Sequence, residues 1–200
     1  MDLGVPRAQE LARALLLTQK PARLPIRVEH LRFDKPLVID SIGHYLELTG
    51  DTLDRLCAGD PAALRDGCTL VRWRKGQKIY IILYNERVRC IRRRSFTLAH
   101  EVGHIYLGHD QDGRAWEQQA NAFAAELLMP RILAAHYLRM LGSRVEPSAA
   151  LAQVFAVSRS VSDLHIRRCV REEAYTDQES KLLARYRTAL PDPNEPQISY

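Results

Sequence analysis

Residues 69–107 decide the fold of this chain: TLVRWRKGQKIYIILYNERVRCIRRRSFTLAHEVGHIYL. Thr69–Arg74 alternates between apolar and polar side chains, and Lys78–Tyr84 is rich in β-branched and aromatic residues, so both segments predict strands. The Lys-Gly-Gln between them predicts a hairpin turn, and Arg87–Ile91 is expected to add a third strand. From Ser95 onward the apolar residues recur at helical spacing. The stretch therefore predicts a small antiparallel sheet that leads into a helix.

The remainder of the chain is predicted to be mainly helical. Helical segments are expected at Arg7–Leu17, Val28–Leu31 and Thr52–Cys57, and again between breaks at residues 108–113, 130, 142–147 and 157–158. The fold class is therefore α+β, with a small antiparallel β-sheet packed on a helical bundle. We expect three regions: a mostly helical N-terminal segment at 1–68, a core at 69–189, and a flexible tail at 190–200, where three prolines oppose a helix.

The composition is that of an ordinary globular protein in solution. Of the 200 residues, 46% are hydrophobic and 26% are charged, and the formal net charge of +5 permits an acidic or nucleic-acid partner without indicating one. No apolar run approaches the roughly 20 residues of a membrane span, and the N-terminus does not resemble a secretory signal. The four cysteines form no C-x-x-C pair, which argues against a zinc ribbon. We expect a cytoplasmic protein without a membrane partner.

The predicted helix from Ser95 carries an H-E-x-x-H motif, His100-Glu101-Val102-Gly103-His104. At about 100° per residue the two histidines lie about 40° apart on one face, so both rings can reach the same metal ion. Glu101 projects beside them, at a place suited to a general base. The other positions of this helix are apolar on all sides, which predicts a buried helix whose polar side chains need partners. The motif therefore predicts a metal centre, with hydrogen-bonded core histidines as the alternative.

A catalytic zinc ion needs a third protein ligand and an open fourth position. The nearby candidates are Glu117, Glu126, His109 and Asp110. On a helical wheel Glu117 and Asn121 border the apolar face of their helix, whereas Glu126 falls on the opposite side and is expected to face solvent. We therefore predict Glu117 as the third ligand. Asn121 is predicted to hydrogen-bond the free ring nitrogen of a ligand histidine, with a helix–helix hydrogen bond as the alternative.

Two segments, Arg94–His104 (RSFTLAHEVGH) and Glu117–Pro130 (EQQANAFAAELLMP), form a specific combined pattern. Together with the hairpin before them, they resemble the ImmA/IrrE family of metallopeptidases. Leu151–Arg168 is similar to the C-terminal helical segment of that family, so the resemblance covers roughly residues 69–170.

The resemblance implies a zinc-dependent peptidase with a gluzincin-like site. His100, His104 and Glu117 would bind one zinc ion per chain, and Glu101 would be the catalytic base. Members of the family typically cleave a transcriptional repressor, often a helix-turn-helix protein encoded beside them, in mobile elements or stress responses. Others sit in toxin–antitoxin-like pairs. The implied partner is therefore a protein substrate, and specifically a transcriptional repressor.

Peptide hydrolysis places further demands on the chain. Glu101 would take a proton from the attacking water, which zinc acidifies, and deliver it to the departing amine. A second donor to the oxyanion is expected, and the spacing leaves His109, His136 and Tyr137 open as candidates. The substrate is expected to lie extended along an edge of the predicted sheet, held by main-chain hydrogen bonds.

Two other functions are open on the sequence alone. Arginines lead into the motif helix and recur in the segment 158–169, a pattern that DNA-binding proteins also show. However, Glu172 and Glu173 follow at once and few aromatic residues interleave, so we do not expect direct binding of nucleic acid. The other alternative is a zinc-containing regulatory module that grips its partner, as in a toxin–antitoxin pair, without cutting it.

Overall fold

The computed structural model describes residues 4–56, 64, 66–111, 113–142, 145–169 and 175–193. Its strands are β1 (Leu37–Ser41), β2 (Gly67–Arg74) and β3 (Gln77–Tyr84). Its helices are α1 (Gly4–Thr18), α2 (Ile42–Thr49), α3 (Leu53–Leu56), α4 (Ile91–Leu107), α5 (Arg114–Leu128), α6 (Arg131–Met140), α7 (Pro147–Val154), α8 (Arg159–Cys169) and α9 (Asp177–Tyr186), with short 3-10 turns at Val28–His30 and Arg187–Ala189. The predicted α+β class is confirmed.

The three strands form a mixed sheet in the order β1-β3-β2. β2 and β3 pair in antiparallel fashion, as predicted, and their turn uses Lys75 (φ 50°) and Gly76 (φ 77°), the left-handed pair of a type I′ hairpin. β1 pairs with β3 in parallel, so the sheet is not purely antiparallel. Arg87–Ile91 is not a strand, because Asn85 accepts hydrogen bonds from the backbone N–H groups of Arg87 and Val88 and turns the chain toward α4.

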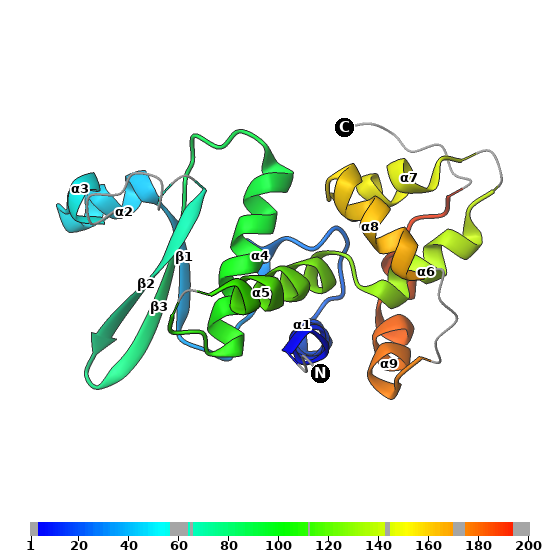
Figure 1. The fold of residues 1–200 in the computed structure, drawn as a ribbon, viewed down its shortest axis with the longest axis horizontal. Helices are drawn as coiled ribbons and strands as arrows, with labels where there is room; N and C mark the ends of the chain where they lie inside the picture. Colours follow the sequence, from blue (N-terminus) through cyan, green and yellow to red (C-terminus); the bar gives the residue numbers. More distant parts are fainter. Residues whose placement is uncertain are drawn as a thin grey trace.

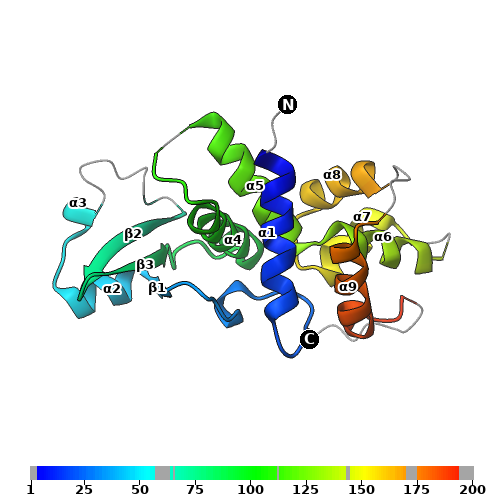
Figure 2. The same cartoon turned by 90° about the horizontal axis from the view of Figure 1, so that it is seen from below.

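The two faces of the sheet pack against different helices. Ile82 of β3 is fully buried in the main core, which it shares with α4, whereas Leu83 faces the other way and packs with Ile42 and Tyr45 of α2. Figure 1 shows the sheet on one side of α4 and α5 and the helices α6–α9 on the other, and Figure 2 shows the same arrangement with α1 lying between them. α4 and α5 therefore occupy the middle of the molecule.

One apolar core joins the helices from both ends of the chain. α1 packs against α4, α5 and α9, and the same cluster includes Leu16, Val102, Phe123, Ile132 and Leu182. Among the helices that the structure describes, none combines the length and the apolar content that a bilayer crossing requires. Most of the predicted flexible tail, residues 194–200, lies outside the described residues, as do residue 57 of the predicted short helix and residues 172–173.

The crossing of α4 and α5 is unusually close at Gly103. A Cβ atom at this position would lie 3.2 Å from the carbonyl oxygen of Ala120 and 3.2 Å from the Phe123 side chain. Because glycine lacks this atom, the two helix backbones approach one another within the motif itself. The approach brings the first turns of α5 alongside the histidines of α4.

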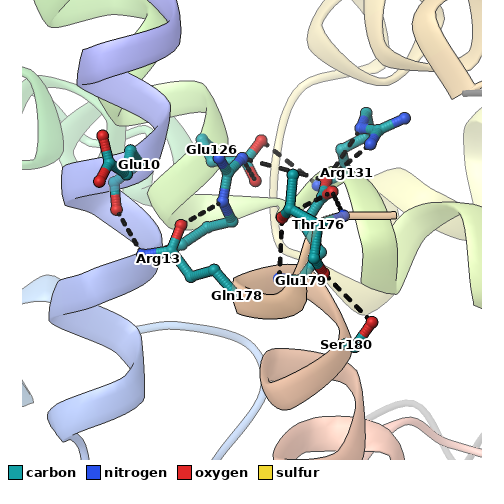
Figure 3. Close-up of polar contacts among 8 residues, drawn as sticks. All are labelled: Glu10, Arg13, Glu126, Arg131, Thr176, Gln178, Glu179 and Ser180. Carbon is teal, nitrogen blue, oxygen red and sulfur yellow. Dashed lines mark hydrogen bonds and ion pairs between the residues drawn. The ribbon is translucent and has the colours of Figure 1, made fainter. Parts of the chain in front are cut away.

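Glu126 lies in a buried ion cluster rather than in solvent. It is 1% exposed, and Arg13 of α1 donates to its Oε1 over 3.1 Å. Arg13 also donates to Gln178 (2.9 Å), and Arg131 of α6 donates to Glu179 (2.8 Å), so the cluster in Figure 3 joins α1, α5, α6 and α9. The prediction of a solvent-facing Glu126 is wrong, because α1 covers a second side of α5.

Burial and pairing act on the two carboxyl groups of this cluster in different ways. Burial raises the pKa of Glu126, and the pairing with Arg13 only partly offsets it. Burial alone would also raise the pKa of Glu179, but hydrogen bonds from Thr176 and the pairing with Arg131 outweigh it and lower that pKa. Glu179 is therefore the more firmly ionised of the two acids.

Candidate metal centre

Three side chains with metal-ligating atoms converge where α4 meets α5. The Nε2 atoms of His100 and His104 are 2.9 Å apart. Glu117 Oε2 lies 3.2 Å from His100 Nε2, and Glu117 Oε1 lies 3.3 Å from His104 Nε2. Within the described part of the chain, this is the group of histidine, cysteine and acidic side chains whose ligand atoms all lie within 4.8 Å of one another. The structure thus brings together the three residues predicted as ligands.

This donor set fits a zinc ion. Two imidazole nitrogens and one carboxylate are typical of catalytic zinc sites. Zinc–ligand bonds of about 2.0–2.1 Å at tetrahedral angles separate two ligand atoms by about 3.3 Å. The two histidine nitrogens are 2.9 Å apart, and each lies 3.2 or 3.3 Å from a different oxygen of Glu117. Two ring nitrogens that face each other and a carboxylate are also most favourable with a cation between them. The residues present therefore suit the metal that the motif predicts.

Asn121 orients the first of the two histidines. Its Oδ1 lies 3.0 Å from His100 Nδ1, one helical turn beyond Glu117 on α5. The amide oxygen can only accept, so this contact places the proton of the His100 ring on Nδ1 and leaves Nε2 free to bind a metal. This is the geometry that the sequence suggests for Asn121.

The second histidine is oriented by a relay through His109. His104 Nδ1 lies 3.0 Å from His109 Nδ1, and His109 Nε2 lies 3.2 Å from Gln119 Oε1. The His109 ring also stacks on Trp116, with ring planes 9° apart and centroids 5.3 Å apart. If His104 keeps Nε2 for a metal, its Nδ1–H donates to His109, and His109 in turn donates from Nε2 to Gln119. One arrangement of protons satisfies the whole relay.

Glu101 lies beside the histidines in a partly buried position. Thr69 of β2 donates a hydrogen bond of 2.5 Å to Glu101 Oε2. Burial raises the pKa of Glu101, and the Thr69 hydroxyl and His100 offset part of this effect. A carboxylate with a raised pKa holds a proton more strongly, which suits a general base.

The four side chains open into one cleft of about 600 Å³ between α4, α5 and the sheet. Thr69 and Val71 of β2 and Tyr80 of β3 form part of its lining, together with Cys68. Burial raises the pKa of the Cys68 thiol to about 11, so this group is protonated at neutral pH and is not a thiolate nucleophile. Among the strands that the structure describes, β2 pairs with β3 alone and is therefore an edge strand of the sheet. An edge strand therefore borders the candidate site.

The structure does not bring all the predicted oxyanion donors to this cleft. His136 and Tyr137 lie on α6, on the opposite side of α5 from the sheet (Figures 1 and 2). Tyr137 is buried in the core at 1% exposure, and neither residue lines the cleft. His109 does line it, but both of its ring nitrogens already have partners. Asp110 also lines the cleft, but it is not part of the three-residue ligand group.

Two polar residues of the site were not among the residues predicted from the sequence. Thr69 is visible as an alternating strand residue, but only the packing of β2 against α4 places its hydroxyl on Glu101. Gln119 lies two positions from both Glu117 and Asn121, and its contact with His109 depends on how the turn after α4 folds back. Neither contact has a local sequence signal.

Comparison with known families gives an independent result. The model of the Peptidase M78 family, described as the IrrE N-terminal-like domain, matches residues 65–166, which is about half of the chain and includes the whole site. A search of curated proteins finds no match. The matched region contains the H-E-x-x-H helix and the helix that supplies Glu117. The chain therefore belongs to the Peptidase M78 family, the ImmA/IrrE type of zinc metallopeptidase.

Proposed function

We propose that this chain is a zinc-dependent endopeptidase of the cytoplasm that cleaves one specific protein. The convergence of His100, His104 and Glu117 in one cleft with Glu101 carries the proposal. These four residues supply three metal ligands and a base, which is the complement needed for peptide hydrolysis with water.

His100, His104 and Glu117 would hold the zinc ion. When bound, zinc acidifies water and stabilises negative charge on a peptide carbonyl oxygen. Asn121 and His109 would keep the two histidine rings in the tautomer and orientation that present Nε2. The two carboxylates of the site, Glu101 and Glu117, have separate tasks in this mechanism.

Glu101 would act as the base and then as the acid. It removes a proton from water as the oxygen attacks the scissile carbonyl carbon, and it passes that proton to the amine that leaves. The Thr69 hydroxyl holds one carboxylate oxygen, Oε2, and so fixes the rotation of the side chain while Oε1 can receive the proton. Thr69 is thus a positioning residue for Glu101.

The substrate would bind as an extended segment along the open edge of β2. An unpaired strand edge offers backbone N–H and C=O groups to an added strand. Thr69 and Val71 line the cleft from this strand, so a segment paired with it passes close to the metal ligands. Such pairing recognises the main chain of the substrate, so selectivity for a particular sequence would come from contacts with substrate side chains beyond the strand edge.

The proposed substrate is a helix-turn-helix transcriptional repressor encoded beside this protein, in a mobile-element or stress-response circuit. The resemblance to the ImmA/IrrE family supports this choice. A module that grips the repressor without cutting it is the competing function, because it needs the same zinc site but no base.

The test is cleavage of the purified neighbouring repressor, followed by mass spectrometry of the products. Wild-type protein loaded with zinc is expected to give two fragments, whereas Glu101→Gln retains zinc and leaves the repressor intact. A Thr69→Val variant is expected to cleave slowly with zinc content unchanged. A wild-type protein that binds the repressor and leaves it whole would favour the gripping module, and a Glu101→Gln variant that still cleaves would exclude Glu101 as the base.

A further inference from the structure

A second cavity lies apart from the metal centre. The segment after α1, residues 19–32, lines a cavity of about 510 Å³ together with Tyr186 of α9. Four basic side chains belong to its lining, namely Lys20, Arg23, Arg27 and Arg32. No lining residue carries a carboxylate. Glu29, the acidic residue of the segment, is not part of the lining. Four positive charges therefore gather here in a chain whose net charge is +5.

The ion pairs among the described residues do not involve the four basic side chains of this cavity. Arg13, Arg93 and Arg131, by contrast, each pair with a carboxylate elsewhere in the fold. Arg185 also approaches the segment, because its guanidinium donates to the carbonyl of Gln19. The four side chains are exposed, and an anion that enters among them would lower the repulsion between their charges.

The shape of this cavity is set by the fold and does not depend on a ligand. Gln19 is buried at 5% exposure, and its Nε2 donates to the carbonyls of Leu15 and Arg32 over 3.0 Å each. Its Oε1 accepts from the backbone N–H of Arg32 over 2.9 Å. One side chain thus ties the beginning of the segment to its end. Tyr186 is fixed in the same way, since its hydroxyl donates to the Leu16 carbonyl over 3.2 Å. A preformed cavity loses little entropy when it binds a ligand.

We propose that this cavity binds a phosphate-bearing small molecule of nucleotide size. Arginine presents a fork of donors that matches phosphate oxygens, and such charge-assisted hydrogen bonds are strong. The lining also includes Leu24, Ile26 and Leu31, which offer apolar contact to the organic part of the ligand. A volume of about 510 Å³ lies within the range of pockets for small molecules. The lining comes from one short segment and from Tyr186, and such a compact site suits a small ligand better than a nucleic-acid strand, which needs an extended groove.

The experiment is isothermal titration calorimetry of the full chain with ADP, inorganic pyrophosphate and adenosine, in magnesium-free buffer. ADP is expected to bind with a stoichiometry of one, pyrophosphate more weakly, and adenosine not measurably. The double variant Arg27→Gln/Arg32→Gln is expected to weaken ADP binding about tenfold or more, because it removes charge-assisted hydrogen bonds. The matched control Arg89→Gln/Arg92→Gln removes the same charge from exposed positions outside the cavity and is expected to change the affinity less than twofold.

Nuclear magnetic resonance of the wild-type chain gives a second test that needs no variant. Amide signals of residues 19–32 are expected to shift with ADP, and those of residues 100–117 are not. The proposal is overturned if ADP and pyrophosphate fail to bind at millimolar concentration, or if both double variants weaken binding equally. It is also overturned if the shifts fall at the metal centre, or if a single-stranded oligonucleotide displaces ADP with an affinity at least tenfold higher.

Discussion

Replacement by alanine should have different effects at the two glutamates of α5: loss of stability at Glu126 and loss of the metal at Glu117. Glu126 is 1% exposed and holds Arg13 at 3.1 Å, and breaking a buried ion pair from one side costs about 3–5 kcal/mol. After the loss of Glu126, Arg13 still has Gln178 at 2.9 Å and the carboxylate of Glu179 at 4.0 Å. We therefore expect the lower value, a loss of about 3 kcal/mol in unfolding free energy. This is a large part of the roughly 5–15 kcal/mol that holds a domain folded. The side chain of Glu117 is 50% exposed, so its replacement by alanine should lower the unfolding free energy of the metal-free protein by no more than about 0.5 kcal/mol.

Urea denaturation and zinc content, measured on the same preparations, separate the two effects. Glu126→Ala is expected to lower the unfolding free energy and to keep about one zinc per folded chain, whereas Glu117→Ala keeps its stability and loses the metal. The double variant Arg13→Met/Glu126→Met removes both charges and should recover most of the lost stability. The reasoning is refuted if Glu126→Ala costs less than about 1 kcal/mol, or if the folded Glu126→Ala protein is the one that loses zinc.

Three further predictions concern the histidines, the pH dependence and the metal. Asn121→Ala and His109→Ala should each lower zinc affinity about 10–100-fold in a chelator competition, since each orients a ligand ring; unchanged affinity would contradict the relay. The lowered pKa of Glu179 adds stability above the ordinary carboxyl pKa of about 4.3, and this stability is lost as the pH falls through the lower folded value. Urea titrations at pH 7 and pH 3 should therefore differ less in Glu179→Gln than in wild type. Zinc at a free concentration 100 times its Kd should stabilise the folded wild type by about 2.7 kcal/mol. Removal of this zinc by a chelator should therefore lower the melting temperature of wild type reversibly, and it should leave the melting temperature of Glu117→Ala unchanged.

Local pattern was sufficient to predict the hairpin and the motif helix. The strands of the hairpin and their turn are neighbours in sequence, and the helical spacing of His100 and His104 follows from the geometry of a single helix. β1 was missed because it pairs in parallel with β3, about forty residues away along the chain. Such pairing leaves no local turn signal.

The helical wheel of α5 gave one useful and one wrong result for the same physical reason. The wheel assumes one apolar face and one solvent face. That assumption places Glu117 and Asn121 beside α4, where the structure has them. It fails for Glu126, because α1 covers a further side of the helix and supplies Arg13 as the partner. A buried acid with an arginine from a distant segment cannot be recognised from the spacing within one helix.

The charges along the edge of β2 have a consequence for self-association. Exposed strand edges are common sites of self-association. The outer half of β2 carries two exposed arginines, Arg72 and Arg74, and the half beside the metal centre carries no charged residue between Gly67 and Val71. A second copy paired in parallel and in register on this edge would bring arginines beside arginines, whereas a foreign segment that pairs with the inner half meets no such repulsion. The edge of β2 can thus remain available to another chain, while its two arginines oppose in-register pairing with a second copy of this strand.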